Sequence, residues 1–401
     1  MTKAYVCGTL DSKEAELRYI RDCLAAAGIG TCLVDLGTSG EPVASDVPAA
    51  EVAAHHPRGT TAVFTGDRGT AVTAMAEAFR QFIATRADLG GIIGAGGSGN
   101  TALVAPAMRA LPVGVPKVLV STVASGNVAP YVGPADIMML HAVADVQGLN
   151  AITRRVLGNA AHALAGMMQH AIPVPESPAK PAVGLTMFGV TTPCVQAVSR
   201  ALEPDYDCLV FHATGTGGQA LEKLVESGLV EAMIDLTTTE IADLLVGGVF
   251  PATEARLAAV IETGIPYIGS VGALDMVNFG ARETVPTAFA ERRFYVHNPQ
   301  VTLMRTTPEE NARFGAWLAA RLNRMTGPVR FFLPEGGVSA IDVPGQPFHD
   351  PAADAALFAA IEAAFQPTTD RRLVRVPHAI NDPAFAAAVV VAFNEIMPKG
   401  R

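Results

Sequence analysis

Short apolar runs alternate with amphipathic stretches along the whole chain. The first run, AYVCG at 4–8, leads into a segment at 11–28 in which Leu17, Ile20 and Leu24 recur at helical spacing. The same alternation predicts strands at 31–37, 61–66, 91–96, 117–122 and 136–140, with helices at 69–86, from Ser98 and at 149–170. Strands that are apolar throughout and are joined by helices are typical of a parallel sheet with both faces covered.

A proline-rich stretch interrupts this alternation. HAIPVPESPAKPAVG at 170–184 holds four prolines, which cannot continue a helix. Beyond it the alternation restarts, with strands predicted in AVGLTMFG, CLVFHATG, AMIDLTTT, PYIGS, RFYVHN, VRFFLPEGG and RLVRV. A chain of 401 residues also exceeds one usual core. We therefore predict an N-terminal domain at 1–172, a linker at 173–182 and a C-terminal domain at 183–401. Both are expected to be Rossmann-like, doubly wound α/β domains with mainly parallel sheets, facing a cleft.

Composition narrows the classes of partner. The net charge of −9 argues against a general nucleic-acid surface, which needs clustered Lys and Arg. The five cysteines show no paired or zinc-binding spacing and indicate reduced thiols. No apolar run reaches the roughly 18–20 residues that span a bilayer, and the N-terminus shows no secretion leader. We expect a cytoplasmic protein with neither a nucleic-acid nor a membrane partner.

A glycine cluster stands where one predicted strand gives way to a helix. In GAGGSGNT at 94–101, glycines allow a close approach of the backbone, and the helix N-terminus favours an anion. The segment is neither a Walker A loop nor a dinucleotide fingerprint after the first strand, and a tight turn with Ser98 as N-cap explains it equally well by itself. The candidate phosphate-binding residues here are Gly96, Gly97, Ser98, Gly99, Asn100 and Thr101.

Three further polar turns follow predicted strands of the same domain. They are GTLDSKE at 8–14, TGDRGT at 65–70 and STVASGN at 121–127. Lys13 opposes the helix dipole unless an anion is nearby, whereas Asp11 with Glu14 also fits a capping box. Asp35 ends the second predicted strand, a position at which an acidic side chain could bind a ribose. The turns add nucleotide-binding candidates Gly8, Thr9, Asp11, Lys13, Gly66, Asp67, Arg68, Thr122 and Ser125, with Asp11 and Asp67 as candidate metal ligands.

The second domain carries its own candidates. HATGTGGQ at 212–219 offers Gly215, Gly217 and Gly218 as a second anion cradle, with His212 as an acid–base group or a packed side chain. LPEGGVSAIDVPGQPFHDP at 333–351 is a long polar loop of the kind that carries chemistry. The candidate catalytic residues are His212, Glu335 and Asp342.

The quoted segments also resemble a known family. VCGTLDSKEAELRYIR, the block at 94–152, FGVTTPCVQAVSRALE and GALDMVNFG are similar to the family of the ATP-binding N-terminal region of the tomato tobamovirus-resistance protein and its bacterial relatives. The likeness covers nearly the whole chain. It implies two Rossmann-like subdomains, binding of ATP with Mg²⁺, and self-association as a homodimer.

Three functions fit these residues. The first is an ATP-binding protein whose glycine turns hold the phosphates and whose reaction is unknown. If it is an enzyme, phosphoryl or adenylyl transfer would suit it, mainly by positioning and charge neutralisation. The second is a nucleotide-gated regulatory module without turnover. The third is an enzyme that acts on a phosphorylated small molecule at the glycine loop of the second domain.

Overall fold

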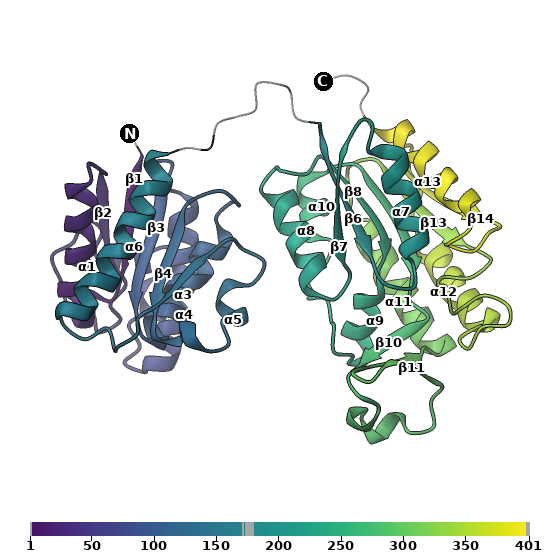
Figure 1. Ribbon diagram of the computed structural model, residues 1–401, viewed down its shortest axis with the longest axis horizontal. Coiled ribbons are helices and arrows are strands. Elements are labelled where there is room, and N and C mark those ends of the chain that lie inside the picture. The colour runs from purple at the N-terminus through teal and green to yellow at the C-terminus, as the bar shows by residue number, and fades with distance from the viewer. Residues whose placement is uncertain (1, 171, 173–179, 398–401) are drawn as a thin grey trace. The chain divides into compact units, whose positions relative to one another are not determined.

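A computed structural model describes residues 2–170, 172 and 180–397. The chain divides into two compact units, Met1–Glu176 and Ser177–Arg401, called unit 1 and unit 2 below (Figure 1). Each unit is built on a parallel sheet whose strands are connected by helices, which confirms the predicted α/β fold class. Within the described residues, we find no helix with the length and apolarity that a bilayer crossing requires.

Unit 1 holds a five-stranded parallel sheet. Its strand order is β2 (Thr31–Asp35), β1 (Lys3–Gly8), β3 (Leu89–Gly96), β4 (Lys117–Ser121) and β5 (Met138–His141). α1 (Leu10–Ala26) and α6 (Ala151–Gln169) cover one face, and α3 (Arg68–Ala84) and α4 (Ser98–Ala110) cover the other. The short helices are α2 (Ala49–Ala53) and α5 (Ala129–Val132). β1, β2, β3 and β4 are buried on both faces over most of their length, which explains their apolar sequences, whereas the edge strand β5 is partly exposed.

The strand order locates a crevice in unit 1. From β1 the chain turns to β2 on one side, and later to β3 on the other. Such a reversal is the switch point of an open doubly wound sheet, and ligands bind outside the carboxyl ends of its strands. The turns after Gly8 and after Gly96 therefore lie at this point.

One predicted strand of unit 1 is wrong. Residues 61–66 form no strand; Thr60–Ala62 is a 3₁₀ turn, closed by a hydrogen bond from Val63 N to Thr60 O at 3.0 Å. Gly59, with φ of 76°, stands just before it, and the segment is held to the core by the buried Val63 and the half-buried Phe64. A short apolar run does not by itself distinguish a strand from a buried turn.

Unit 2 repeats the topology with one strand more. Its parallel sheet runs β7 (Asp207–His212), β6 (Ala182–Met187), β8 (Ala232–Thr237), β9 (Tyr267–Gly272), β13 (Val329–Pro334) and β14 (Arg371–Val376). α7 (Thr192–Leu202) and α13 (Pro383–Ile396) cover one face. The other face carries α8 (Thr216–Glu226), α9 (Thr239–Val246), α10 (Ala258–Thr263), α11 (Pro308–Leu322) and α12 (Pro351–Ala364).

RFYVHN does not join the main sheet of unit 2 as its pattern predicted. It forms β11 (Phe294–Asn298) in a separate antiparallel sheet of order β10 (Met276–Phe279), β12 (Val301–Arg305), β11. Asn298 accepts a hydrogen bond from Gln300 N at 2.8 Å in the tight turn between β11 and β12. This hairpin was not predicted from the sequence. Only two residues separate β11 from β12, and a connection that short joins antiparallel neighbours.

Candidate functional site

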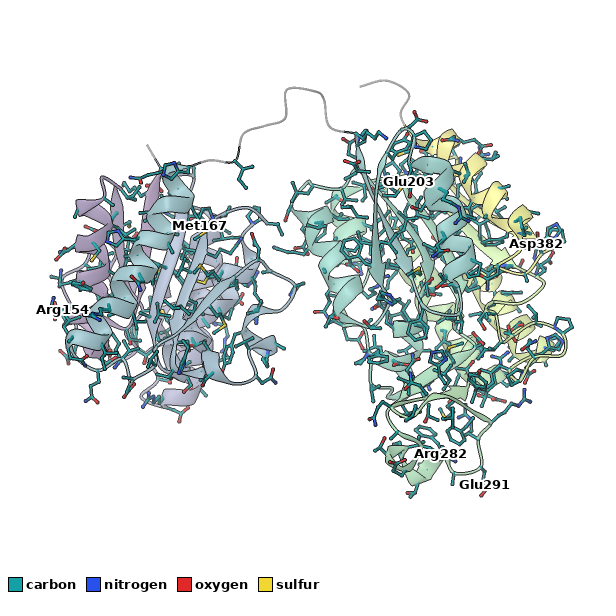
Figure 2. All side chains as sticks on the ribbon, viewed as in Figure 1. Arg154, Met167, Glu203, Arg282, Glu291 and Asp382 are labelled. Carbon is teal, nitrogen blue, oxygen red and sulfur yellow. The ribbon has the colours of Figure 1, made fainter. Side chains whose placement is uncertain are left out.

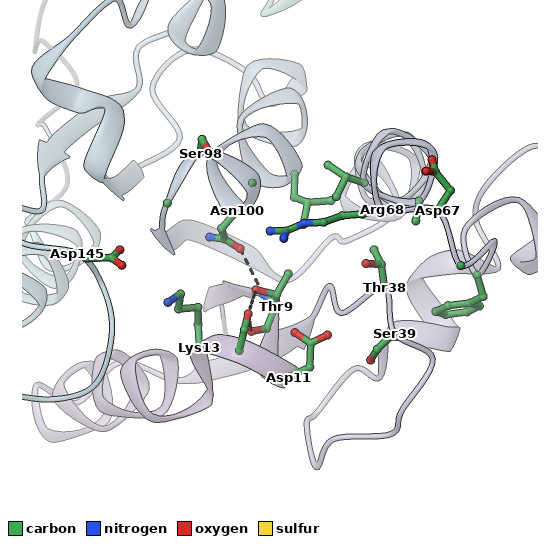
Figure 3. A pocket seen from close by; sticks show the side chains of 18 residues that line it. Thr9, Asp11, Lys13, Thr38, Ser39, Asp67, Arg68, Ser98, Asn100 and Asp145 are labelled. Atoms are coloured by element: carbon green, nitrogen blue, oxygen red, sulfur yellow. Dashed lines mark hydrogen bonds between the residues drawn. The ribbon is translucent and has the colours of Figure 1, made fainter.

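A cavity of about 820 Å³ opens at the switch point of unit 1 (Figure 3). Three of the four predicted polar turns line it, those after β1, before α3 and after β3. Thr38, Ser39, Phe64 and Asp145 also line the cavity and were missed by sequence reasoning, because nothing local distinguishes them from other loop residues. The predicted residues in the wall are Thr9, Asp11, Lys13, Gly66, Asp67, Arg68, Gly97, Ser98, Gly99 and Asn100.

The N-terminus of α4 is open toward this cavity. Gly97, and not Ser98, is its N-cap, and no side chain caps the helix. A Cβ placed on Gly97 would meet only Thr122 Oγ1 at 3.8 Å, and one on Gly99 only Arg68 Nη2 at 3.7 Å. The first amides of a helix have no partner within the helix. The protein therefore leaves them to water or to a ligand.

Other members of the predicted set hold the turn together. The Asn100 side chain donates to Ala95 O at 2.9 Å and accepts from Thr9 N at 3.3 Å, so it ties the ends of β1 and β3 together. A Cβ on Gly8 or on Gly96 would lie 2.8 or 2.7 Å from Asn100 atoms. Those two glycines therefore make room for Asn100. Thr101 is buried, with its hydroxyl 2.6 Å from Ser121 Oγ.

Asp35 occupies the other helix N-terminus at the switch point. Its Oδ1 accepts hydrogen bonds from Leu10 N at 3.0 Å and from Gly37 N at 2.8 Å, and the residue is 1% exposed. Burial raises the pKa of Asp35, while these two backbone hydrogen bonds oppose the rise. The Asp35 carboxyl group is thus buried and hydrogen-bonded to the start of α1, so it is not available to bind a ribose as the sequence suggested. Of the two helices, α4 is the one with its amides free of side-chain caps.

Two cations point into the cavity (Figure 3). Arg68 lies beside Gly99, and among residues 2–170 and 180–397 no carboxylate forms an ion pair with it. Lys13 Nζ donates to Val146 O, and the backbone of Lys13 departs from helical geometry with φ of −131°. A cation beside a helix N-terminus is unfavourable unless an anion joins them.

The two candidate metal ligands have different surroundings. Asp67 is the N-cap of α3 and accepts hydrogen bonds from Thr70 N at 2.9 Å and from Thr70 Oγ1 at 2.8 Å, which lower the pKa of Asp67. Asp11 lines the cavity. Over the described parts of the chain, no group of three or more His, Cys, Asp or Glu side chains could hold a metal. A metal here would take most of its ligands from outside the protein.

The loop after β5 borders the cavity in a strained conformation. Val143 has φ of 65°, and Ala144 N donates to Ala142 O at 2.7 Å, which closes a γ-turn around it. The Val143 side chain is 67% exposed. A β-branched residue at positive φ is a genuine outlier. The γ-turn is followed directly by Asp145, which lines the cavity, and by Val146, whose carbonyl oxygen accepts a hydrogen bond from Lys13 Nζ.

Val143→Gly is expected to stabilise unit 1 by about 1 kcal/mol, because glycine adopts positive φ without the clash that valine suffers. Hydrogen exchange of β1 and β3 in urea measures the change. Val143→Ala is the matched control, since alanine keeps the Cβ that causes the strain. Equal stability of the glycine and alanine variants would show that the γ-turn stores no strain.

The glycine turn of unit 2 is filled by the protein itself. Glu240 Oε2 accepts from Gly215 N at 2.8 Å, and a Cβ on Gly218 would clash with the same carboxylate. A Cβ on Gly217 would clash with His212 O. The turn also follows β7, an edge strand, so it is not equivalent to the turn after β3. The group that this turn holds is therefore the Glu240 carboxyl group of the protein itself.

The candidate catalytic residues of unit 2 lie in different environments. His212 ends β7 and is exposed, whereas Glu335 follows β13 and pairs with Arg375; β6, β8 and β9 separate the two strands. Asp342 is 0% exposed and accepts a hydrogen bond from Val338 N at 3.0 Å. The structure therefore does not bring the three side chains into one site.

Asp342 belongs to a buried carboxyl cluster around Arg305. Arg305 Nη2 lies 3.1 Å from Asp342 Oδ1 and 3.1 Å from Asp354 Oδ1. Asp275 accepts a hydrogen bond from Ser339 Oγ at 2.8 Å. Burial is the main reason that the pKa of Asp275 and that of Asp342 rise to about 6 and the pKa of Asp354 rises to about 8. This loop is a packed part of the fold.

Unit 2 is expected to lose stability as the pH rises from about 5 to about 9. Because the pKa values of Asp275, Asp342 and Asp354 are higher in the folded state than in the unfolded chain, the folded state binds more protons. Their stabilisation is complete at low pH and is lost as each group ionises. Fluorescence of Trp317, the sole tryptophan, follows unfolding of unit 2 in urea.

Asp354→Asn should flatten this pH dependence above about pH 7, because the amide resembles the protonated carboxyl. The exposed Asp370→Asn variant serves as control and should keep the slope of the wild type. A stability of unit 2 that rises between these pH values would contradict the assignment.

Fold and site define a protein of two parallel-sheet α/β units, with a glycine turn open to a cavity at the switch point of the first. Residues 2–173 match the N-terminal domain, and residues 180–397 the C-terminal domain, of the uncharacterised protein family UPF0261. The chain belongs to this family, which confirms the resemblance noted in the sequence.

Relatives occur in bacteria and in a plant. A UPF0261 protein of Rhizobium meliloti is 54% identical over 397 residues, covering 99% of each chain. A UPF0261 protein of Clostridium tetani is 42% identical over 404 residues, again with 99% of each chain. The ToMV resistance protein Tm-1(GCR237) of Solanum lycopersicum is 41% identical over 428 residues, which cover all of this chain and 56% of the tomato protein.

Proposed function

We propose that unit 1 binds a nucleotide, ATP foremost, with its phosphates on the first amides of α4. The observation that carries this proposal is the uncapped start of α4, where Gly97 and Gly99 leave open space beside Arg68. Backbone amides, the helix dipole and a guanidinium together suit a phosphate. The switch-point position is where doubly wound sheets take their ligands.

The charges of the cavity favour a metal-bound nucleotide. Its wall carries the cations Lys13 and Arg68 against the carboxylates Asp11, Asp67 and Asp145. A bare polyphosphate would meet this excess of negative charge. Mg²⁺ commonly binds through one or two carboxylates plus phosphates and water. Of the two carboxylates predicted as metal ligands, Asp11 is the one that would hold it, because Asp67 is engaged as a helix cap.

The same geometry is compatible with an enzyme that transfers a phosphoryl group and with a regulatory module that only binds the nucleotide. Phosphoryl transfer depends on positioning and charge stabilisation, which these residues supply. A nucleotide-gated module would use the same contacts without a second substrate. An enzyme centred on the glycine loop of unit 2 is less favoured, because Glu240 already fills that loop. Self-association as a homodimer stays a prediction, which light scattering checks.

Calorimetric titration of the full chain with ATP, ADP, NAD and tripolyphosphate, with and without Mg²⁺, tests the proposal. We expect Mg-ATP to bind more tightly than ADP, and NAD to bind weakest, because α4 and the two cations recognise a terminal phosphate chain. Release of ADP or AMP during incubation would identify turnover. If neither nucleotides nor tripolyphosphate bind at millimolar concentration, the proposal is wrong.

A further inference from the structure

The cavity of unit 1 has two chemically different ends. Its apolar side chains are Phe64, Ala71, Val72 and Leu103, which come from the start of α3, the turn before it and the second turn of α4. α3 and α4 pack in one core cluster, so these side chains share one end. Figure 3 shows Lys13 and Asp145 at the other end, away from Arg68.

Phe64 gives the apolar end a flat ring. It is half-buried and packs against the core cluster that includes Met75 and Phe79, while it also lines the cavity. Within the part of the chain that the structure describes, no other aromatic ring contacts Phe64. A half-buried ring that also lines a cavity is suited to stack on a flat ligand.

Hydroxyl groups border this ring. A Cβ on Gly40 would lie 3.9 Å from Phe64 Cδ1, so the loop that contains Thr38 and Ser39 runs beside the ring. Figure 3 shows both side chains on the Arg68 side of the cavity. A sugar placed there would find hydrogen-bonding groups next to an aromatic surface.

We infer that a nucleoside triphosphate binds in one direction, with its base on Phe64, its ribose at Thr38 and Ser39, and its last phosphate toward Lys13. This rests on the proposed function of unit 1. A base at the opposite end would strip water from Lys13 and Asp145 without a ring to stack on. Stacking accepts every base. Unit 1 therefore takes nucleoside triphosphates as a class, and the ring of Phe64 stacks on adenine and guanine equally well.

Titration of the full chain with Mg-ATP, Mg-GTP and Mg-tripolyphosphate tests the direction. Phe64→Leu keeps apolar volume but removes the ring, and it should weaken ATP and GTP by a similar factor of about 10. Tripolyphosphate should bind the variant as it binds the wild type. Phe64→Tyr should restore both nucleotides, and thermal unfolding confirms that each variant is folded.

The outcomes separate this inference from the proposed function. If Phe64→Leu binds ATP as tightly as the wild type, or if the wild type binds ATP no better than tripolyphosphate, the base does not lie on Phe64, while the anion site stands. If Phe64→Leu weakens ATP and leaves GTP unchanged, the class-wide claim is wrong. If the wild type binds none of the three, the proposed function fails and the inference fails with it.

Discussion

Gly97→Asp is expected to weaken binding of Mg-ATP by about 100-fold or more without loss of folding. Gly97 is the N-cap of α4, with φ of −82°, and open space lies in front of it. An aspartate therefore fits without backbone strain. Its carboxylate would occupy the amides on which the phosphates are proposed to rest, and it would also repel them.

The same substitution should stabilise the free protein. Aspartate is among the best N-cap residues, and its negative charge at a helix N-terminus adds to the effect, so a gain of about 1 kcal/mol is expected. A variant that is more stable and binds less tightly distinguishes a filled site from a damaged fold.

Gly97→Asn is the matched control for charge. Asparagine caps a helix about as well as aspartate but carries no charge. We expect it to retain more affinity for Mg-ATP than Gly97→Asp, because repulsion of the phosphates is absent. Calorimetric titration and thermal unfolding of the three proteins provide the comparison. Unchanged affinity in Gly97→Asp would remove α4 from the site.

Local sequence predicted much of unit 1. Apolar runs such as GIIGAG are buried on both faces, and the unbroken apolar run between two helical stretches identified β3. The glycine turn at the cavity was also predictable, since a strand, glycines and a helix follow one another directly at Gly94–Thr101. What the pattern left open was which glycines face the cavity. Gly97 lines it, whereas Gly96 makes room for Asn100, and that difference depends on tertiary packing.

The second glycine turn shows why the rest was out of reach. Its sequence resembles the first, yet Glu240, 25 residues beyond Gly215, supplies the internal anion. Likewise Asp342 looked catalytic in a polar loop, and only the fold shows that it faces Arg305 from a site without solvent. Contacts between distant residues decide whether a polar side chain meets a ligand or its own protein.

The carboxylate that fills the turn of unit 2 is held by a buried charge network. Arg256, 3% exposed, contacts Glu240, Asp235 Oδ2 at 2.7 Å and Glu222 Oε1 at 2.9 Å. Tyr267 donates to Asp235 at 3.0 Å. Burial raises the pKa of Glu222 and of Glu240, while the charge of Arg256 opposes the rise. One guanidinium therefore keeps three buried carboxyl groups in place.

Arg256→Met should destabilise unit 2 by about 3–5 kcal/mol or more, because it leaves buried carboxylates without their partner. Trp317 fluorescence in urea measures unit 2, and hydrogen exchange of β1 and β3 should show unit 1 unchanged. Arg372→Met, at an exposed arginine of the same unit, is the matched control with little expected effect.

The pH dependence of this variant separates lost charge pairing from lost packing. Without Arg256 the pKa values of Glu222 and Glu240 rise further, so these groups take up protons at a higher pH in the folded variant than in the wild type. The stability deficit should then shrink as the pH falls from about 8 to about 5. A deficit that stays constant over this range would mean that methionine fails because of its shape, and that the carboxylates of unit 2 do not depend on Arg256 for their charge.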